Sequence, residues 1–184
     1  NEDELSNKLE MLRSHGITKD KAKFELKSSK PWTYEQQMLG FNYRMTDIQA
    51  ALGLSQLSRV GKIVKKRNHI YERYKRLLSK IPVEFLNISD ECYSALHLAV
   101  IKVDKLNSKT HRKVFEELRT AGIGVQVHYT PVHLQPYYRR MGFREGDFPA
   151  AEAYANSAIS IPLFPELRKD EQDRVIKALT ELAN

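Results

Sequence analysis

Apolar residues recur at helical spacing in the first half of the chain. Leu5, Leu9 and Leu12 fall on one face of a helix predicted over residues 2–14, and Gly16 follows as a C-terminal cap. The stretch that follows has no strong period, so we expect it to be mostly loop.

The longest helical period runs from Thr46 to about Leu78. This is long for one helix of a globular protein, and Ser58 and Gly61 interrupt it. We therefore expect two helices joined by a bend. Thr46 is a favourable N-cap for the first of them, and Asp47 adds negative charge to its first turn.

The second half of the chain alternates between strand-like and helix-like patterns. Within residues 93–103, alternation places Leu96, Leu98, Val100 and Lys102 on one face of a strand. Further strands are predicted at 83–86 and 125–129, an extended segment at 157–165, and helices from Ser108 to about Ala121, from Asp147 to about Asn156 and from Asp170 onward. This alternation is typical of an α/β or α+β unit.

The composition limits the size and location of the protein. A chain of 184 residues suits one domain, or one domain with an appendage, and 41% hydrophobic residues is ordinary for a soluble protein. No apolar run approaches the roughly 20 residues of a membrane helix, and the first residues are too polar for a secretory signal. The single cysteine, Cys92, favours a reducing compartment, and we expect a cytoplasmic protein.

The formal net charge of +7 raises the question of a nucleic-acid partner. However, the densest basic cluster, at residues 62–76, lies on a predicted helix that also carries Ile63, Val64 and Ile70. A basic solvated face opposite an apolar one is common. We therefore expect no nucleic-acid partner. The same charge would suit an anionic small molecule or another subunit.

Three polar or aromatic residues stand just before the helix that Thr46 caps. They are Asn42, Tyr43 and Arg44, in a loop opened by Gly40. An amide and a guanidinium beside the N–H groups of a helix start can bind an anion such as phosphate. The alternative is that these side chains only hold the loop in place, and the residues alone leave both readings open.

A second candidate cluster follows the strand predicted at 125–129. It contains His128, Tyr129 and His133, in a loop with two prolines. A metal site would use the two histidines, but the sequence has no other metal-binding signature, so we expect none. The loop either contacts a ligand or is held by aromatic packing and hydrogen bonds. No glycine-rich phosphate loop, dinucleotide fingerprint or serine-hydrolase elbow is present.

The chain resembles the DegT/DnrJ/StrS family of sugar aminotransferases, which use pyridoxal 5'-phosphate (PLP). Four stretches carry the resemblance in the same order and at similar spacings: LRSHG at 12–16, GFNYRMTDIQAALGLSQL at 40–57, VQVHYTPVHLQPYY at 125–138 and SIPLFPELRKDEQDRVI at 160–176. The segments HYTPVHLQPYY and PWTYEQQMLGFNYR are closest to the subgroup that aminates C4 of UDP-linked 4-keto-6-deoxy-N-acetylhexosamines, as in pseudaminic acid synthesis.

The resemblance implies the α/β fold of the fold type I PLP-dependent transferases. The family is about twice this length, and its first half is the large cofactor domain with the Schiff-base lysine. Residues 1–45 would be the end of that domain and a connecting loop. Residues 46–184 would be the long helical region and the C-terminal small domain, a mostly antiparallel sheet with helices. Because no lysine here matches the Schiff-base position, we expect the 184 residues alone to be inactive.

The resemblance also implies an activity, partners and site residues. The complete protein would transfer an amino group from glutamate to C4 of the UDP-linked sugar, as a homodimer with its active site at the interface. Asn42 would reach the cofactor phosphate of the partner subunit, and Arg44 would also contact the cofactor. The residues expected to line the sugar-nucleotide pocket are Tyr43, His128, Tyr129, Thr130, Pro131 and His133.

Two other functions remain open from the sequence. One is a PLP-dependent sugar dehydratase of the same family, in which a histidine replaces the lysine. The other is a non-catalytic interaction domain that has kept the small-domain fold. In the family, the residue that separates these possibilities lies upstream of the stretch that this chain covers.

Overall fold

The computed structural model describes residues 2–26, 30–103, 106 and 111–183. The chain forms two compact units, Asn1–Ser58 and Arg59–Asn184. The break between them falls at the bend expected near Ser58, where one helix ends and the next begins. The predicted boundary between the large and small domains after residue 45 stays a prediction.

The described part of the first unit contains two α-helices, one 3-10 helix and a small β-ribbon. Its elements are α1 (Asp3–Leu12), β1 (Ile17–Thr18), the 3-10 helix η1 (Lys21–Lys23), β2 (Glu35–Gln36) and α2 (Asp47–Leu57). The two strands pair antiparallel, with Ile17 opposite Gln36. No residue of α1 or α2 is buried within the chain.

Helix α2 begins where the sequence predicts. The Thr46 hydroxyl accepts a hydrogen bond from the Gln49 backbone N–H at 3.3 Å, and the Gln49 side chain accepts from the Thr46 N–H at 2.9 Å. This capping box satisfies two backbone donors at the helix start. The predicted Thr46 cap and the interruption after Leu57 are both confirmed.

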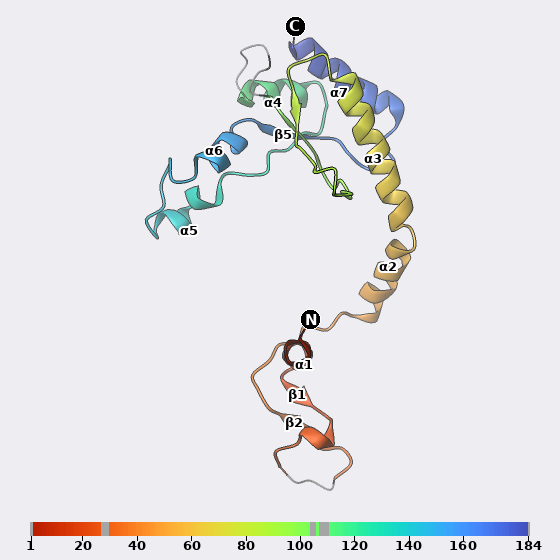
Figure 1. Cartoon of the computed structure of the whole chain (residues 1–184), viewed down its shortest axis with the longest axis vertical. Coiled ribbons are helices and arrows are strands. Elements are labelled where there is room, and N and C mark those ends of the chain that lie inside the picture. Colours follow the sequence, from red (N-terminus) through yellow and green to blue (C-terminus); the bar gives the residue numbers. More distant parts are fainter. Residues whose placement is uncertain (1, 27–29, 104–105, 107–110, 184) are drawn as a thin grey trace. The chain divides into compact units, whose positions relative to one another are not determined.

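The second unit contains a three-stranded sheet with helices around it (Figure 1). Its elements are α3 (Val60–Leu77), β3 (Glu84–Phe85), β4 (Ala99–Lys102), α4 (His111–Thr120), η2 (Val132–Leu134), α5 (Pro136–Arg139), α6 (Pro149–Ala155), β5 (Ala158–Ile161) and α7 (Lys169–Ala183). The strand order is β3-β4-β5 and both pairings are antiparallel.

One face of this sheet lies on the hydrophobic core. Ile101 and Ile159, paired across β4 and β5, are fully buried there. Three helices also contribute to this core: α3 through Tyr74, α4 through Leu118 and α7 through Leu179. Burying a side chain of this size stabilises the fold by about 1.5–3 kcal/mol, so this layer provides most of the unit's stability.

The strand predicted at 93–103 is shorter than expected, because β4 begins only at Ala99. The preceding segment is held by side chains of α3 instead. Arg67 donates to the carbonyls of Leu96 and His97 at 3.1 and 2.9 Å. Leu96 also has a left-handed backbone, with φ of 49°, which interrupts a strand. The predicted single face from Leu96 to Lys102 is therefore wrong.

The strand predicted at 125–129 is reduced to one antiparallel bridge, between Gln126 and Ser160. Continuing the ladder would require the Ala158 carbonyl to accept from the backbone of His128. That carbonyl instead lies 3.0 Å from Nε2 of His111, a contact from α4 that local sequence does not reveal. The segment after Gln126 therefore runs as loop.

Two predicted helix starts are also corrected. Helix α6 begins at Pro149, and the Asp147 carboxylate accepts from the Arg144 N–H at 2.9 Å instead of capping that helix. Helix α7 begins at Lys169, so Asp170 lies in its first turn. The predicted helix start at Ser108 lies outside the described residues.

Candidate functional site

The Asn42–Arg44 segment is held by backbone hydrogen bonds to the turn after α1. Phe41 N–H donates to the Leu12 carbonyl at 2.6 Å, and His15 N–H donates back to the Phe41 carbonyl at 2.7 Å. Tyr43 N–H donates to the Arg13 carbonyl at 2.9 Å. The motifs LRSHG and GFNYR are therefore joined to each other by backbone hydrogen bonds.

Two glycines allow this close approach. A Cβ atom on Gly40 would lie 2.2 Å from the backbone nitrogen of Gly16. A Cβ on Gly16 would lie 1.9 Å from the carbonyl oxygen of Met38, and Gly16 also has a φ of +69°, which favours glycine. Any other residue at either position would push apart the two backbone segments, the turn at 12–16 and the stretch from Met38 onward.

The side chains of this segment are exposed. Tyr43 is 73% exposed and its ring stacks on Phe41 with centroids 4.8 Å apart. Within the described residues, the side chains of Asn42 and Arg44 make no hydrogen bond or ion pair. Backbone bonds therefore hold the loop, and the amide and guanidinium donors are free to bind an anion at a well-defined position.

His128 lies beside the sheet in the second unit. It is half-buried, its Nδ1 lies 2.9 Å from the hydroxyl oxygen of Ser160, and its ring makes an edge-on contact with Tyr129 at 4.7 Å. Tyr129 and Thr130 are exposed, and Pro131 precedes the short helix η2. Together they form a surface with a ring nitrogen, a phenol and a hydroxyl available for hydrogen bonds.

His133 points inward from η2 and is only 8% exposed. Its Nε2 lies 2.8 Å from the Glu152 carboxylate, which also accepts from the Gly146 N–H at 2.9 Å. The hydrogen bond from His133 lowers the pKa of Glu152 below its ordinary value. His133 also lines an apolar cavity of about 380 Å³ with Phe143 and Phe148. Sequence reasoning missed Glu152, whose partner lies 19 residues away.

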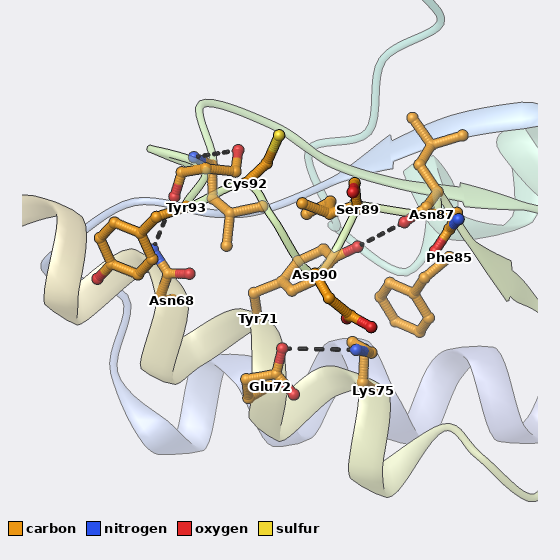
Figure 2. Close-up of a pocket in the computed structure, with 14 residues that line it drawn as sticks. Asn68, Tyr71, Glu72, Lys75, Phe85, Asn87, Ser89, Asp90, Cys92 and Tyr93 are labelled. Atoms are coloured by element: carbon orange, nitrogen blue, oxygen red, sulfur yellow. Dashed lines mark hydrogen bonds and ion pairs between the residues drawn. The ribbon is translucent and has the colours of Figure 1, made fainter.

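A second cavity, of about 420 Å³, lies between α3 and the segment at 85–96 (Figure 2). Figure 2 shows Tyr71, Glu72 and Lys75 extending from the helix toward that segment. Their polar groups are paired within the cavity wall: Lys75 with Glu72 at 3.5 Å, and the Tyr71 hydroxyl with the Leu86 carbonyl at 3.4 Å. Burial, followed by the nearby Glu72 charge, raises the pKa of Tyr71. None of the predicted site residues lines this cavity.

The described residues contain neither a candidate metal site nor a helix that could span a membrane. No group of three or more His, Cys, Asp or Glu side chains in that part of the chain could coordinate a metal ion. No helix there is both long and apolar enough to cross a membrane.

Comparison with known proteins gives one consistent assignment. The model of the DegT/DnrJ/EryC1/StrS aminotransferase family matches residues 1–180. The spore coat polysaccharide biosynthesis protein SpsC of Bacillus subtilis is 36% identical over 188 residues, covering 98% of this chain and 47% of that protein. The chain thus spans about half the length of the curated relatives it matches.

Solved structures agree with this assignment. Spr1654 of Streptococcus pneumoniae, in its apo form, has a TM-score of 0.85 at 28% identity, covering 100% of this chain and 44% of that one. Helicobacter pylori PseC, an aminotransferase involved in pseudoaminic acid biosynthesis, has a TM-score of 0.83 at 27% identity, covering 99% and 47%.

These comparisons also confirm the predicted cofactor and fold class. Spr1654 is known in a PLP form and in a pyridoxamine phosphate form. The family and these neighbours are PLP-dependent sugar aminotransferases with the type I fold, as the sequence predicts. This chain belongs to the DegT/DnrJ/EryC1/StrS aminotransferase family.

Proposed function

We propose that this chain is the C-terminal part of a PLP-dependent enzyme that transfers an amino group from glutamate to C4 of a UDP-linked 4-keto-6-deoxy amino sugar. Family membership supports the transfer of an amino group to a sugar. The name of SpsC, for spore coat polysaccharide biosynthesis, supports a sugar that serves in polysaccharide assembly. That of PseC, for pseudoaminic acid biosynthesis, supports an amino sugar as the product.

The observation that carries this proposal is the pair of free donors at Asn42 and Arg44. Both stand on backbone held by the turn at 12–16, just before the start of α2. An amide N–H and a guanidinium fit a dianionic phosphate, because both donate and neither brings negative charge. These residues therefore fit the phosphate of PLP.

When bound, PLP supplies the electron sink and carries the amino group between glutamate and the sugar. The residues of this chain bind and orient. Asn42 donates its amide hydrogen to a phosphate oxygen of the cofactor in the partner subunit, and Arg44 adds a positive charge at the same anion. The Schiff-base lysine belongs to the portion of the family that this chain does not cover, so the 184 residues alone are expected to be inactive.

The surface at His128 is proposed to contact the sugar nucleotide. Tyr129 offers an exposed ring and hydroxyl, Thr130 a hydroxyl, and Pro131 a rigid start to the η2 turn. Tyr43, in the first unit, is exposed and is proposed separately as a sugar-nucleotide contact. The net charge of +7 favours approach of a UDP pyrophosphate. His133 is buried, so its proposed role is to support the loop that carries Tyr129 and Thr130, and with it one wall of the sugar-nucleotide pocket.

The proposed homodimer is supported by the surface of α2. Ile48 is 83% exposed within the chain, and Leu52, Leu54 and Leu57 are also well exposed. An exposed apolar surface of this kind suits a subunit interface. The cytoplasmic location expected from the single cysteine forms part of the same proposal. No observation favours the dehydratase or the non-catalytic interaction domain.

The test is an amination assay on the protein as its gene encodes it. The purified protein is incubated with PLP, glutamate and a UDP-linked 4-keto-6-deoxy-N-acetylhexosamine, and the sugar nucleotide is followed by mass spectrometry. We expect a 4-amino sugar nucleotide that takes its nitrogen from ¹⁵N-labelled glutamate. A product formed by loss of water would indicate the dehydratase instead. An unchanged sugar with every amino donor tried would reject the proposal.

A further inference from the structure

The hydroxyl of Ser160 is buried and contacts the ring of His128. Ser160 is 6% exposed, and its Oγ lies 2.9 Å from Nδ1 of His128. The backbone supports the same contact: Gln126 N–H donates to the Ser160 carbonyl at 3.1 Å, and Ser160 N–H donates to the Gln126 carbonyl at 2.8 Å. His128 follows Gln126 by two residues, so its side chain is a diagonal neighbour of Ser160 on the same face.

Ser160 cannot easily move away from this ring. It lies in β5 between Ile159 and Ile161, which point to the opposite face and are buried in the core. The other edge of β5 is paired with β4, where Val100 stands opposite Ser160. A group fixed by two strand pairings can orient a neighbouring ring with little loss of conformational entropy.

The available donors and acceptors show which group donates in the contact between Ser160 and His128. A serine hydroxyl has one hydrogen to donate and can also accept. Within the described residues, Nδ1 of His128 is the one partner of the Ser160 hydroxyl. If Nδ1 donated, the buried hydroxyl hydrogen would have no acceptor, which is costly. If the hydroxyl donates, only acceptor capacity is left unused, and the ring carries its hydrogen on Nε2 instead.

We propose that Ser160 is a positioning residue that donates to Nδ1 of His128 and so presents Nε2–H as a hydrogen-bond donor to an oxygen of the sugar nucleotide. Nε2 has no partner within the described part of the chain, so it is available for that bond. The identity of the recipient rests on the proposed function. The orientation and tautomer of His128 do not depend on it.

The tautomer is measured by NMR on the PLP-loaded protein, as its gene encodes it, with ¹⁵N-labelled histidine at a pH where His128 is neutral. The spectrum of a His128→Gln variant identifies the signals. We expect a protonated Nε2 and an unprotonated Nδ1. Ser160→Ala should give a mixture of tautomers, and Ser160→Thr, which keeps the hydroxyl, should restore the single form.

Ser157 provides the matched control. It is also buried and stands just before β5, but its hydroxyl donates to the Ala153 carbonyl at 2.9 Å. Ser157→Ala should therefore leave the His128 signals unchanged. A wild-type spectrum with the hydrogen on Nδ1, or a Ser160→Ala spectrum identical to the wild type, would overturn the proposal.

Steady-state kinetics test whether the sugar nucleotide accepts the hydrogen bond from Nε2 of His128. Ser160→Ala should raise KM for the sugar nucleotide about tenfold, the effect of one weakened hydrogen bond, and leave kcat within about twofold. An unchanged KM beside the expected tautomer would reject the sugar nucleotide as the recipient. Amination by the wild-type protein in the same assay keeps that result separate from a failure of the proposed function.

Discussion

Nε2 of His133 donates a hydrogen bond to the Glu152 carboxylate across 2.8 Å, joining η2 to α6. The direction follows from chemistry, because an ionised carboxylate can only accept. The same carboxylate oxygen accepts from the N–H of Gly146, which lies in the loop between α5 and α6. One glutamate therefore connects both η2 and this loop to α6. Its contact with His133 gives the buried histidine ring a hydrogen-bond partner.

Replacing Glu152 with glutamine should destabilise the protein in a pH-dependent way. Because the folded pKa of Glu152 is lowered, its stabilising effect is present above the ordinary carboxyl pKa of 4.5 and is lost as pH falls through the folded value. The difference in urea midpoint between wild type and Glu152→Gln should therefore be largest well above pH 4.5 and shrink as the pH falls below that value.

Glu166 is the control for this measurement. It is exposed, and within the described residues it makes no hydrogen bond or ion pair. Glu166→Gln should leave the urea midpoint close to wild type at every pH. A Glu152→Gln difference that stays constant down to the acid limit would count against the role given to the carboxylate.

Gly40→Ala should disrupt the contact between the turn at 12–16 and the segment that carries Asn42. The added Cβ would meet the Gly16 nitrogen at 2.2 Å, and backbone must move to relieve it. We expect a loss of about 2 kcal/mol or more in the free energy of unfolding, together with weaker PLP binding. Thermal unfolding and a PLP titration measure the two effects.

The same substitution at Gly61 is the control. A Cβ there meets nothing within 4 Å, and Gly61 lies inside helix α3. Gly61→Ala should therefore stabilise the protein by about 0.5–1 kcal/mol, because alanine restricts the unfolded chain and favours the helix. Equal losses of stability in both variants would show that the close approach at Gly40 is not the cause.

Asn42→Ala should weaken retention of PLP. A hydrogen bond to a charged oxygen contributes about 1.5–3 kcal/mol, so we expect a Kd at least about tenfold higher in equilibrium dialysis. Asn87→Ala removes an equally exposed asparagine of the other unit and should change nothing. Wild-type affinity in the Asn42→Ala variant would remove this residue from the cofactor site.

Arg44 is assigned by parallel titrations. Arg44→Ala and Arg44→Lys are compared for binding of PLP and of the UDP-sugar. We expect the loss on PLP, with partial recovery in the lysine variant, because lysine keeps the charge but not the planar pair of donors. A loss on the UDP-sugar alone would move Arg44 to the substrate site, and no loss on either would discard it as a ligand contact.

The predictions from sequence that succeeded depend on local chemistry. Thr46 and Gln49 form their capping box within one helical turn, so the start of α2 is visible in the sequence. The interruption of the helix near Ser58 is local too, since residues that weaken a helix interior mark it. The last helix is likewise found where the sequence predicts it, and α7 begins one residue earlier than expected.

The failures involve partners far away in the sequence. The strand expected at 93–103 is shortened by Arg67, about 30 residues away, and the one at 125–129 by the contact of His111 with Ala158. The candidate site could also be predicted only in part. The sequence shows Asn42 and Arg44 as a motif. Only the structure shows that backbone hydrogen bonds hold their loop and that, within the described residues, their side chains make no hydrogen bond or ion pair. Ser160 carried no signal beyond being a polar residue between two isoleucines.

The central claim is that Asn42 completes the cofactor site of the partner subunit, and mixed dimers test it most directly. One parent carries Asn42→Asp, whose carboxylate repels the phosphate. The other has the family's Schiff-base lysine replaced by alanine. Each is inactive alone at limiting PLP, while a hybrid dimer has one site with both the lysine and Asn42.

Amination activity after the two parents are unfolded and refolded together is the deciding measurement. Random reassociation makes about half of the dimers hybrid, so the account predicts recovery of about a quarter of the wild-type activity. Activity that stays at the level of the separate parents, with hybrid dimers shown to form, would contradict it.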